Sequence, residues 1–458
     1  MKIGIVGWGI EGQSAFKYFG PGHEYLIVNE HPRDDFPAPS EKIKINFLSG
    51  EKPPGITGNV DDLSYLEGLE ACEKIIVTPT SMKNLEKKYP KNAPIWDKVT
   101  SVMEIFFDGV ASRNIIGITG TKGKGTTSTL TAKMLEAAGK KVHLGGNIGI
   151  SVLDFLEDVQ PDDWVVLELS SFQLYSLRRS PHIGVCLMVV PEHMDWHADM
   201  ADYVAAKSNM FKHQKTDDIA IYMADNSYSE KIANASPGKK IAYYDSPGAR
   251  VRNDGMIVIG EPETELIHKS KVKLLGEHNL QNICAAATAA WQVVQDPKAI
   301  EEVAGSFSGL EHRLELVREL DGVKYYDDSF GTTPDTATVA LLAFSEPKII
   351  ILGGSDKGAY FTGLAEAVVK SNVKQAIVIG QTADKISAAL RAKGFNNIIF
   401  GLKTMPEIVT EARKHAKSGD VVLLSAASAS FGLFHDYKDR GNQFKSAVNS
   451  LSSLGKTY

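Results

Sequence analysis

A glycine-rich segment at residues 115–127 constrains the fold of this 458-residue chain more than any other feature. It reads IIGITGTKGKGTT, so an apolar run leads into a loop of glycine, threonine and lysine and then into a stretch with helical spacing. Glycines let the backbone N–H groups of such a loop close around phosphate oxygens, and the helix N-terminus adds a positive dipole end. The pattern therefore predicts a strand, a P-loop and a helix that together bind ATP.

The residues of this loop divide into a phosphate cradle and a magnesium ligand. The predicted ATP-binding residues are Gly120, Thr121, Lys122, Gly123, Lys124, Gly125, Thr126 and Thr127. Lys124 can reach the β- and γ-phosphates. Because Gly125 stands where serine or threonine usually follows this lysine, we expect Thr126 to supply the hydroxyl for Mg²⁺. The helix should end at Gly139, a residue suited to the C′ position.

Length and composition bound the class of protein. A chain of 458 residues exceeds a single hydrophobic core and fits about three domains of ~150 residues. The net charge of −6, without a lysine- or arginine-rich block, argues against nucleic acid as a partner. No apolar run approaches the ~20 residues of a membrane span. Three scattered cysteines and a strand-like N-terminus lead us to expect a cytoplasmic protein without disulfides.

A second glycine pattern opens the chain. Gly7, Gly9 and Gly12 have the G-x-G-x-x-G spacing and follow an apolar segment at residues 2–6. This spacing is typical of a Rossmann-like βαβ unit that holds a pyrophosphate, and Glu30 stands near the position where an acidic residue would meet a ribose. The pattern by itself leaves NAD and other pyrophosphate ligands open.

Further candidate residues are scattered through the rest of the chain. Glu168 ends a predicted strand, where a carboxylate can hold Mg²⁺, and His193 follows another strand as either a metal ligand or a structural histidine. Lys207 lies in a helical stretch, where a lysine is usually solvated. Arg313 and Asp328 have the character of a phosphate clamp with its partner, although such residues also form ordinary ion pairs.

Several short motifs in a fixed order resemble those of the Mur ligases, the ATP-dependent ligases that extend muramyl peptides. The matching segments are residues 117–124, 145–149, 168–173, 192–195, 205–207, 276–282, 312–313, 424–430 and 440–442. Within the family they resemble the members that join D-glutamate to UDP-N-acetylmuramoyl-L-alanine. The resemblance implies an α/β protein with a Rossmann-like UDP-binding domain at 1–97, a P-loop domain at 98–308 and a Rossmann-like amino-acid-binding domain at 309–458.

The resemblance also implies a reaction. ATP would phosphorylate the substrate carboxylate, and the amine of glutamate would displace phosphate from the acyl phosphate. The implied catalytic residues are Lys124, His193 and Lys207. Thr126 and Glu168 would hold one Mg²⁺, and His193 with a Lys207 carbamylated by CO₂ would hold a second. The enzyme would be a cytoplasmic monomer of peptidoglycan synthesis that binds neither nucleic acid nor membrane.

Family positions carry over to further binding residues. Gly7, Gly9, Gly12, Asn147, Ser170 and Gln173 would bind the UDP substrate, and Asn282, Arg313 and Asp328 would contact ATP. Thr332, Lys357, Ser430 and Tyr437 would line the amino-acid site. ATP would thus bind between the central and C-terminal domains, with a hinge near residues 306–311.

Some positions depart from the family pattern. Phe330 replaces a lysine common in related ligases, Tyr437 replaces a phenylalanine, and residues 78–80 read TPT where SPG is usual. These changes leave L-glutamate or another acidic amino acid open as the second substrate.

Three other functions fit part of the chain. Folylpolyglutamate synthase shares the ligase core and the glycine after the P-loop lysine, but it lacks a full N-terminal nucleotide-binding domain. A NAD-dependent dehydrogenase would explain only residues 7–12 and Glu30. A non-catalytic nucleotide switch would leave Glu168, His193 and Lys207 without a role.

Overall fold

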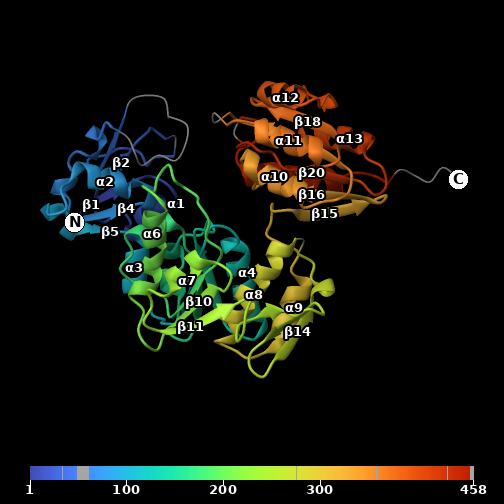
Figure 1. Ribbon diagram of the computed structural model, residues 1–458. Coiled ribbons are helices and arrows are strands. Elements are labelled where there is room, and N and C mark those ends of the chain that lie inside the picture. The colour runs from blue at the N-terminus through green and yellow to red at the C-terminus, as the bar shows by residue number, and fades with distance from the viewer. Residues whose placement is uncertain (34, 49–60, 275, 357–358, 431, 454–458) are drawn as a thin grey trace. The chain divides into compact units, whose positions relative to one another are not determined.

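The computed structural model describes residues 1–33, 35–48, 61–274, 276–356, 359–430 and 432–453 (Figure 1). The chain divides into two compact units, which are described separately. The first comprises Met1–Lys273 and Glu277–Phe307, and the second comprises Leu274–Gly276 and Ser308–Tyr458. Two large parallel sheets lie in the first unit and a third, mostly parallel sheet lies in the second, which confirms the predicted α/β fold with three such sheets. No helix within these described ranges has the length and apolarity needed to cross a membrane.

The first sheet is built from the N-terminal residues. Its strands are β1 (Lys2–Val6), β2 (Glu24–Asn29), β3 (Ile43–Phe47), β4 (Lys74–Val77) and β5 (Val99–Thr100), in the order β3-β2-β1-β4-β5 and all parallel. The accompanying helices are α1 (Ile10–Phe19), α2 (Met82–Lys88) and α3 (Val102–Gly109). Ile3, Ile5 and Ile27 are fully buried, as expected for strands covered on both faces.

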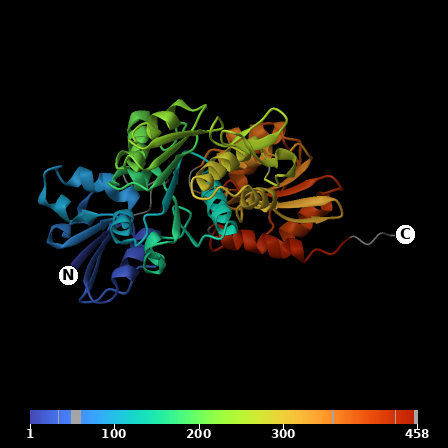
Figure 2. The same cartoon turned by 90° about the horizontal axis from the view of Figure 1, so that it is seen from below.

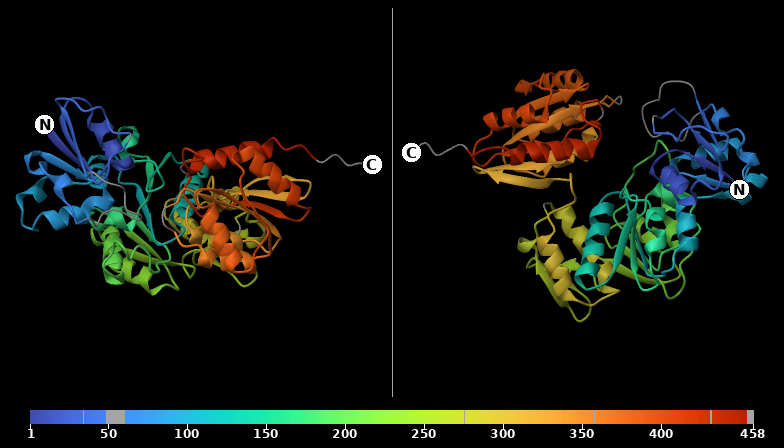
Figure 3. Two further views of the ribbon diagram at one scale, coloured as in Figure 1. Left: turned by 90° about the horizontal axis from the view of Figure 1, so that it is seen from above. Right: turned by 180° about the vertical axis from the view of Figure 1, so that it is seen from behind.

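The second sheet follows directly in the chain. Its strands are β6 (Ile115–Thr119), β7 (Val142–Gly146), β8 (Trp164–Glu168), β9 (Ile183–Cys186), β10 (Ile219–Met223) and β11 (Lys239–Tyr243), in the parallel order β11-β10-β9-β6-β8-β7. Its helices are α4 (Lys124–Ala137), α5 (Ser171–Tyr175), α6 (Met200–Lys212), α7 (Ser227–Ala233), α8 (Glu277–Trp291) and α9 (Pro297–Ser306). Figures 2 and 3 show the strands of this sheet among these helices from other sides.

The C-terminal end of α4 has the predicted glycine stop. Gly139 adopts φ +80°, its N–H donates to the Glu136 carbonyl at 2.9 Å, and the Lys140 N–H donates to the Leu135 carbonyl at 2.9 Å. This pair of bonds is a Schellman motif, which satisfies carbonyls that the helix end would otherwise leave unpaired.

A small antiparallel sheet completes the first unit. It consists of β12 (Arg250–Val251), β13 (Met256–Ile259) and β14 (Thr264–His268), and α9 packs against β14.

The second unit contains the third sheet, in the order β15-β16-β20-β17-β18-β19. Its strands are β15 (Glu315–Leu320), β16 (Val323–Asp327), β17 (Lys348–Gly354), β18 (Val373–Gly380), β19 (Ile398–Ile399) and β20 (Val421–Leu424). Its helices are α10 (Pro334–Leu342), α11 (Thr362–Lys370), α12 (Ala383–Ala392), α13 (Met405–His415) and α14 (Tyr437–Asn449). The edge strand β15 is antiparallel to β16, whereas the Rossmann-like domain expected at 309–458 would have parallel strands.

Candidate active site

The predicted P-loop joins β6 to α4 as expected. Gly120 and Gly123 have φ values of +145° and +85°. A Cβ on Gly123 would lie 2.2 Å from the Asn282 side-chain oxygen, so α8 packs closely against the loop. Lys124 Nζ donates to the carbonyls of Gly120 at 3.1 Å and Thr121 at 2.9 Å. The loop thus requires glycine and holds its lysine beside its own backbone.

Lys207 lies beside this loop and is not solvated. Its side chain is 1% exposed, and Nζ donates to the Gly120 carbonyl at 2.9 Å and lies 4.5 Å from the centre of the Tyr203 ring. Burial, and after it the positive charge of Lys124, lower the pKa of Lys207 to about 7. The amine is therefore poised to exist in its neutral, nucleophilic form near neutral pH.

The other predicted metal ligands lie at the carboxyl ends of the same sheet. Glu168 ends β8 and is buried, and Asn147 Nδ2 donates to its Oε1 at 2.7 Å. Thr126 is half-buried in the first turn of α4. His193 has φ +58°, and burial lowers its pKa, with Lys124 and Lys207 among the charges that act on it. A carboxylate, a hydroxyl and a neutral imidazole are groups able to hold Mg²⁺, with the oxygens preferred.

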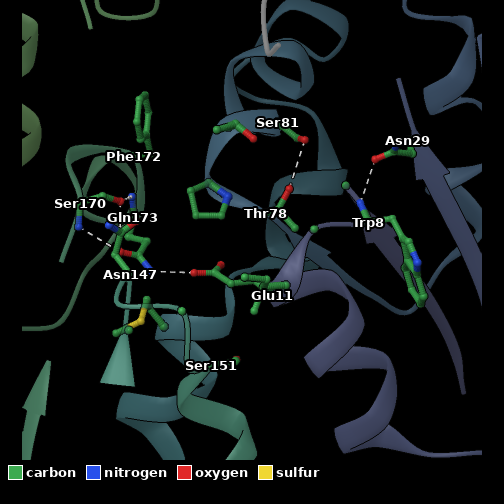
Figure 4. A pocket seen from close by; sticks show the side chains of 18 of the residues that line it. Trp8, Glu11, Asn29, Thr78, Ser81, Asn147, Ser151, Ser170, Phe172 and Gln173 are labelled. Carbon is green, nitrogen blue, oxygen red and sulfur yellow. Dashed lines mark hydrogen bonds between the residues drawn. The ribbon is translucent and has the colours of Figure 1, made fainter. Parts of the chain in front are cut away.

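A cavity of about 350 Å³ lies in the first unit, and we call it the inter-sheet pocket. Its lining includes Gly7, Trp8, Gly9, Ile10, Glu11, Asn29, Glu30, His31, Arg33, Thr78, Ser81, Gly146, Asn147, Ser170, Phe172 and Gln173. The lining comes from loops that follow β1, β2 and β4 in the first sheet and β7 and β8 in the second (Figure 4). Strand ends of this kind are where open α/β sheets bind ligands.

Most residues predicted to bind the UDP substrate meet in this pocket. Gly7 and Gly9 line it on one side, and Asn147, Ser170 and Gln173 line it on the other. Gly12 is not among the lining residues. It supports the loop from within, since a Cβ there would lie 2.1 Å from the Gly7 carbonyl oxygen.

Sequence reasoning missed Glu11 as a pocket residue. Gln173 Nε2 donates to Glu11 Oε1 at 2.7 Å, and burial raises the pKa of Glu11 to about 7. The only sequence signal was its place inside the G-x-G-x-x-G segment, where any residue type is allowed.

The second unit brings its own predicted residues together. The Arg313 guanidinium lies 3.7 Å from the centre of the Phe330 ring, and Phe330 meets Tyr437 edge-on at 5.1 Å. Asp328 is buried, and its two carboxyl oxygens accept from the Leu314 N–H at 3.2 Å and the Ser425 hydroxyl at 2.7 Å. Burial raises the pKa of Asp328 to about 7.

The predicted amino-acid site is only partly described. Ser430 is buried, Thr332 is exposed, and Tyr437 begins α14. Lys357 lies outside the described residues. The buried Arg440, which no prediction used as a site residue, donates to the Ser329 carbonyl at 2.7 Å and the Ser428 carbonyl at 3.0 Å. Arg440 thereby links the loop that contains Ser329 to the loop that contains Ser428.

Comparisons with known proteins match both units. Residues 118–290 match the Mur ligase middle domain, and residues 312–428 match the Mur ligase, glutamate ligase domain. A UDP-N-acetylmuramoylalanine–D-glutamate ligase of Acetivibrio thermocellus is 40% identical over 401 residues, 85% of each chain. A protein of the same name from Clostridium kluyveri is 36% identical over 462 residues, covering 98% of this chain and 97% of the relative.

Solved structures share the fold at lower identity. A UDP-N-acetylmuramate-alanine ligase, MurC, of Thermotoga maritima gives a TM-score of 0.57 at 16% identity, over 98% of this chain and 99% of the other. A MurF ligase of Thermotoga maritima in complex with ADP gives 0.56 at 18% identity, over 82% and 89%.

Proposed function

The chain belongs to the Mur ligase family, and from this premise we propose that it joins D-glutamate to UDP-N-acetylmuramoyl-L-alanine in an ATP-dependent reaction of peptidoglycan synthesis. The observation that carries the proposal is the P-loop with two lysines against it, Lys124 at the start of α4 and the buried Lys207 on α6. A strand, loop and helix of this form suit a nucleoside triphosphate.

The proposed reaction has two steps. A carboxylate oxygen of the UDP substrate attacks the γ-phosphorus, and the bond from that phosphorus to ADP breaks. The amine of glutamate then attacks the acyl carbon, phosphate leaves with the bridging oxygen, and the amine loses a proton. Lys124 and the N–H groups of the loop would balance the charge on the transferring phosphoryl group.

The proposal that the enzyme binds two Mg²⁺ ions and carries a carbamylated lysine rests on the metal-ligating side chains of the first unit. Thr126 and Glu168 would hold one Mg²⁺ and His193 with carbamylated Lys207 a second, and these ions would neutralise phosphate charge when bound. Carbamylation joins the neutral Nζ of Lys207 to the carbon of CO₂ with loss of a proton. The product is anionic, so it replaces a buried cation beside Lys124 by an oxygen ligand.

The inter-sheet pocket supports the assignment of the UDP moiety to the first sheet. The Gly7–Gly9 loop leads into the first turn of α1, and this helix N-terminus provides backbone donors suited to a diphosphate. The nucleotide-linked sugar and ATP are cytoplasmic metabolites, so the proposal includes a cytoplasmic location. We also propose that the enzyme is a monomer.

The test is a substrate panel. The enzyme is incubated with ATP, Mg²⁺, UDP-N-acetylmuramoyl-L-alanine and D-glutamate, L-glutamate or D-aspartate, and phosphate release and product mass are measured. We expect release and a dipeptide product with D-glutamate. Lys124→Ala should lose at least ~10³-fold in rate, because the transferring phosphoryl group loses its fixed cation. Lys133→Ala, an exposed lysine on the same helix, is the matched control. Phosphate release without dependence on any amino acid would refute the proposal.

A further inference from the structure

Glu11 is an acidic residue of the inter-sheet pocket, and its negative charge would conflict with the proposed ligand. It lies between Gly9 and Gly12 in the first turn of α1, where a diphosphate would be held. An ionised carboxylate at this place would repel the phosphates, while a neutral carboxylic acid could donate a hydrogen bond to them.

The hydrogen bonds around Glu11 fix which of its oxygens is available. Gln173 is held by its own oxygen, which accepts from the Ser170 N–H at 2.9 Å and the Ser170 hydroxyl at 3.1 Å. Its amide nitrogen must therefore face Glu11, and it donates to Oε1 at 2.7 Å. Figure 4 shows this contact across the pocket. The other oxygen, Oε2, is buried and has no hydrogen-bond partner among the described residues.

Neighbouring charged groups do not offset a charge on Glu11. Within the described part of the chain, no lysine, arginine or histidine forms an ion pair with it. Five charged groups on the elements around it have other contacts. Glu30 accepts from Asn84, Arg33 pairs with Asp35, Asp154 accepts from Ser14, Glu104 accepts from the Arg178 N–H, and Glu168 accepts from Asn147. His31 also lines the pocket and has both ring nitrogens buried.

We propose that Glu11 is a neutral carboxylic acid in the inter-sheet pocket and that its Oε2–H donates to the diphosphate of the UDP substrate, which links capture of this substrate to one proton. The phosphate oxygen supplies the partner that Oε2 lacks, and Gln173 holds the carboxyl group at the wall of the pocket. The inference rests on the proposed function, because it requires that this pocket takes the UDP substrate. Burial of the carboxyl group, which raises its pKa to about 7, supports the neutral form.

The affinity for the UDP substrate should therefore depend on pH. Below pH ~7 the free enzyme holds the proton and binds the diphosphate. Above it, binding must first restore the proton, so affinity falls as pH rises. The diphosphate diester keeps a constant charge across this range, so the ligand itself adds no dependence. For one linked proton, Kd should rise about tenfold between pH 6 and pH 8.

The experiment measures Kd of UDP-N-acetylmuramoyl-L-alanine for the full chain by calorimetry at pH 6, 7 and 8, without ATP. Glu11→Gln keeps the acceptor for Gln173 and is always neutral. It should therefore bind at pH 8 about as tightly as the parent binds at pH 6. Glu30→Gln and His31→Gln are matched controls for other titratable residues of the pocket, and both should retain the tenfold slope whatever their affinity.

The outcomes separate the two proposals. No binding by the parent at pH 6 would contradict the proposed function. Binding with a Kd independent of pH, or a slope that survives in Glu11→Gln, would overturn the role of Glu11 and leave the function standing. If Glu11→Gln does not fold, calorimetry of the parent in buffers of different ionisation enthalpy decides instead. We expect uptake of close to one proton per site at pH 8, and no uptake would overturn the inference.

Discussion

Several ionisable residues of the candidate site lie where their charged form is disfavoured. Burial raises the pKa of Glu11 and Asp328 and lowers that of Lys207 and His193. Groups with such shifts concentrate at functional sites, because catalysis and binding often need a charge state that water would not favour. Lys207 is the most consequential, since both its burial and the positive charge of Lys124 disfavour the ammonium form.

The first prediction concerns Lys207. Lys207→Ala should be nearly inactive, and added acetate should partly restore turnover, because its carboxylate can replace the carbamate oxygens. Lys212→Ala, at an exposed position on the same helix, is the matched control and should keep the parent rate. Steady-state phosphate release with and without acetate makes the measurement. A parent-like rate for Lys207→Ala would exclude the proposed role.

Asp328 gives a prediction for stability against pH. Its carboxyl group has a folded-state pKa of about 7, above the ordinary value near 4, so between these pH values the folded chain holds a proton that the unfolded chain releases. Stability contributed by this group is therefore present at low pH and lost as pH rises toward 7. Asp328→Asn removes the titration and keeps both hydrogen bonds, since the Ser425 hydroxyl can accept from the new amide.

The measurement is Tm of the parent and of Asp328→Asn at pH 5 and pH 7.5. The parent should lose at least about 2–4 °C more than the variant over this interval. Asp384→Asn, an exposed aspartate in the same unit, should follow the parent. An equal change in the parent and in Asp328→Asn would show that the buried carboxyl group is not the source.

At the scale of elements, the two glycines that flank α4 allow the cost of backbone strain to be measured apart from the cost of a steric clash. Gly123 precedes the helix with φ +85° and Gly139 follows it with φ +80°. A Cβ on Gly123 would lie 2.2 Å from the Asn282 oxygen, whereas a Cβ on Gly139 would meet nothing within 4 Å. The two positions thus share the conformational cost of a left-handed residue and differ in what the new methyl group touches.

We expect Gly139→Ala to lower the free energy of unfolding by about 1–2 kcal/mol while keeping activity, because only the backbone conformation is penalised. Gly123→Ala should also lower kcat/KM for ATP by about 10²-fold, since the loop or α8 must shift to admit the methyl group. Thermal unfolding and steady-state kinetics on both variants make the comparison. Equal kcat/KM values for ATP would show that the packing of Asn282 on the loop is irrelevant to the reaction.

Most elements that carry the candidate site could be predicted because their signals are local. The apolar runs of β1, β4, β6, β8 and β20 and the glycine stop of α4 appear in the sequence with nearly the observed bounds. Strand β15 was missed because it is half-exposed and lacks a continuous apolar run. Its two-residue turn, Asp321-Gly322, has positive φ at both residues and is a hairpin signal that was overlooked.

The features of individual residues that sequence reasoning missed depend on tertiary contacts. Helical spacing gave no indication that Lys207 is buried, because its partners come from β6 and the P-loop. The same holds for Glu11, whose contact with Gln173 joins positions 162 residues apart. Phe330 was noted as the loss of a lysine, but only the structure shows the Arg313 guanidinium stacked on its ring.

For the whole molecule, the described structure assigns distinct groups to each unit. The P-loop, Lys207 and the inter-sheet pocket belong to the first unit, while Arg313, Asp328 and Ser430 belong to the second. The two units divide between Phe307 and Ser308, beside the predicted domain boundary at 308 and inside the segment 306–311 predicted to be a hinge. The hinge and both domain boundaries, at residues 97 and 308, stay predictions.

Isotope transfer shows whether ATP activates the carboxylate of the UDP substrate. UDP-N-acetylmuramoyl-L-alanine carrying ¹⁸O in its carboxylate is turned over with ATP, Mg²⁺ and D-glutamate, and the released phosphate is analysed by mass spectrometry. An acyl phosphate passes its bridging oxygen to the leaving phosphate. We therefore expect each released phosphate to carry one ¹⁸O atom. Phosphate released without the label would mean that water, and not the substrate carboxylate, attacks ATP, and it would contradict the account.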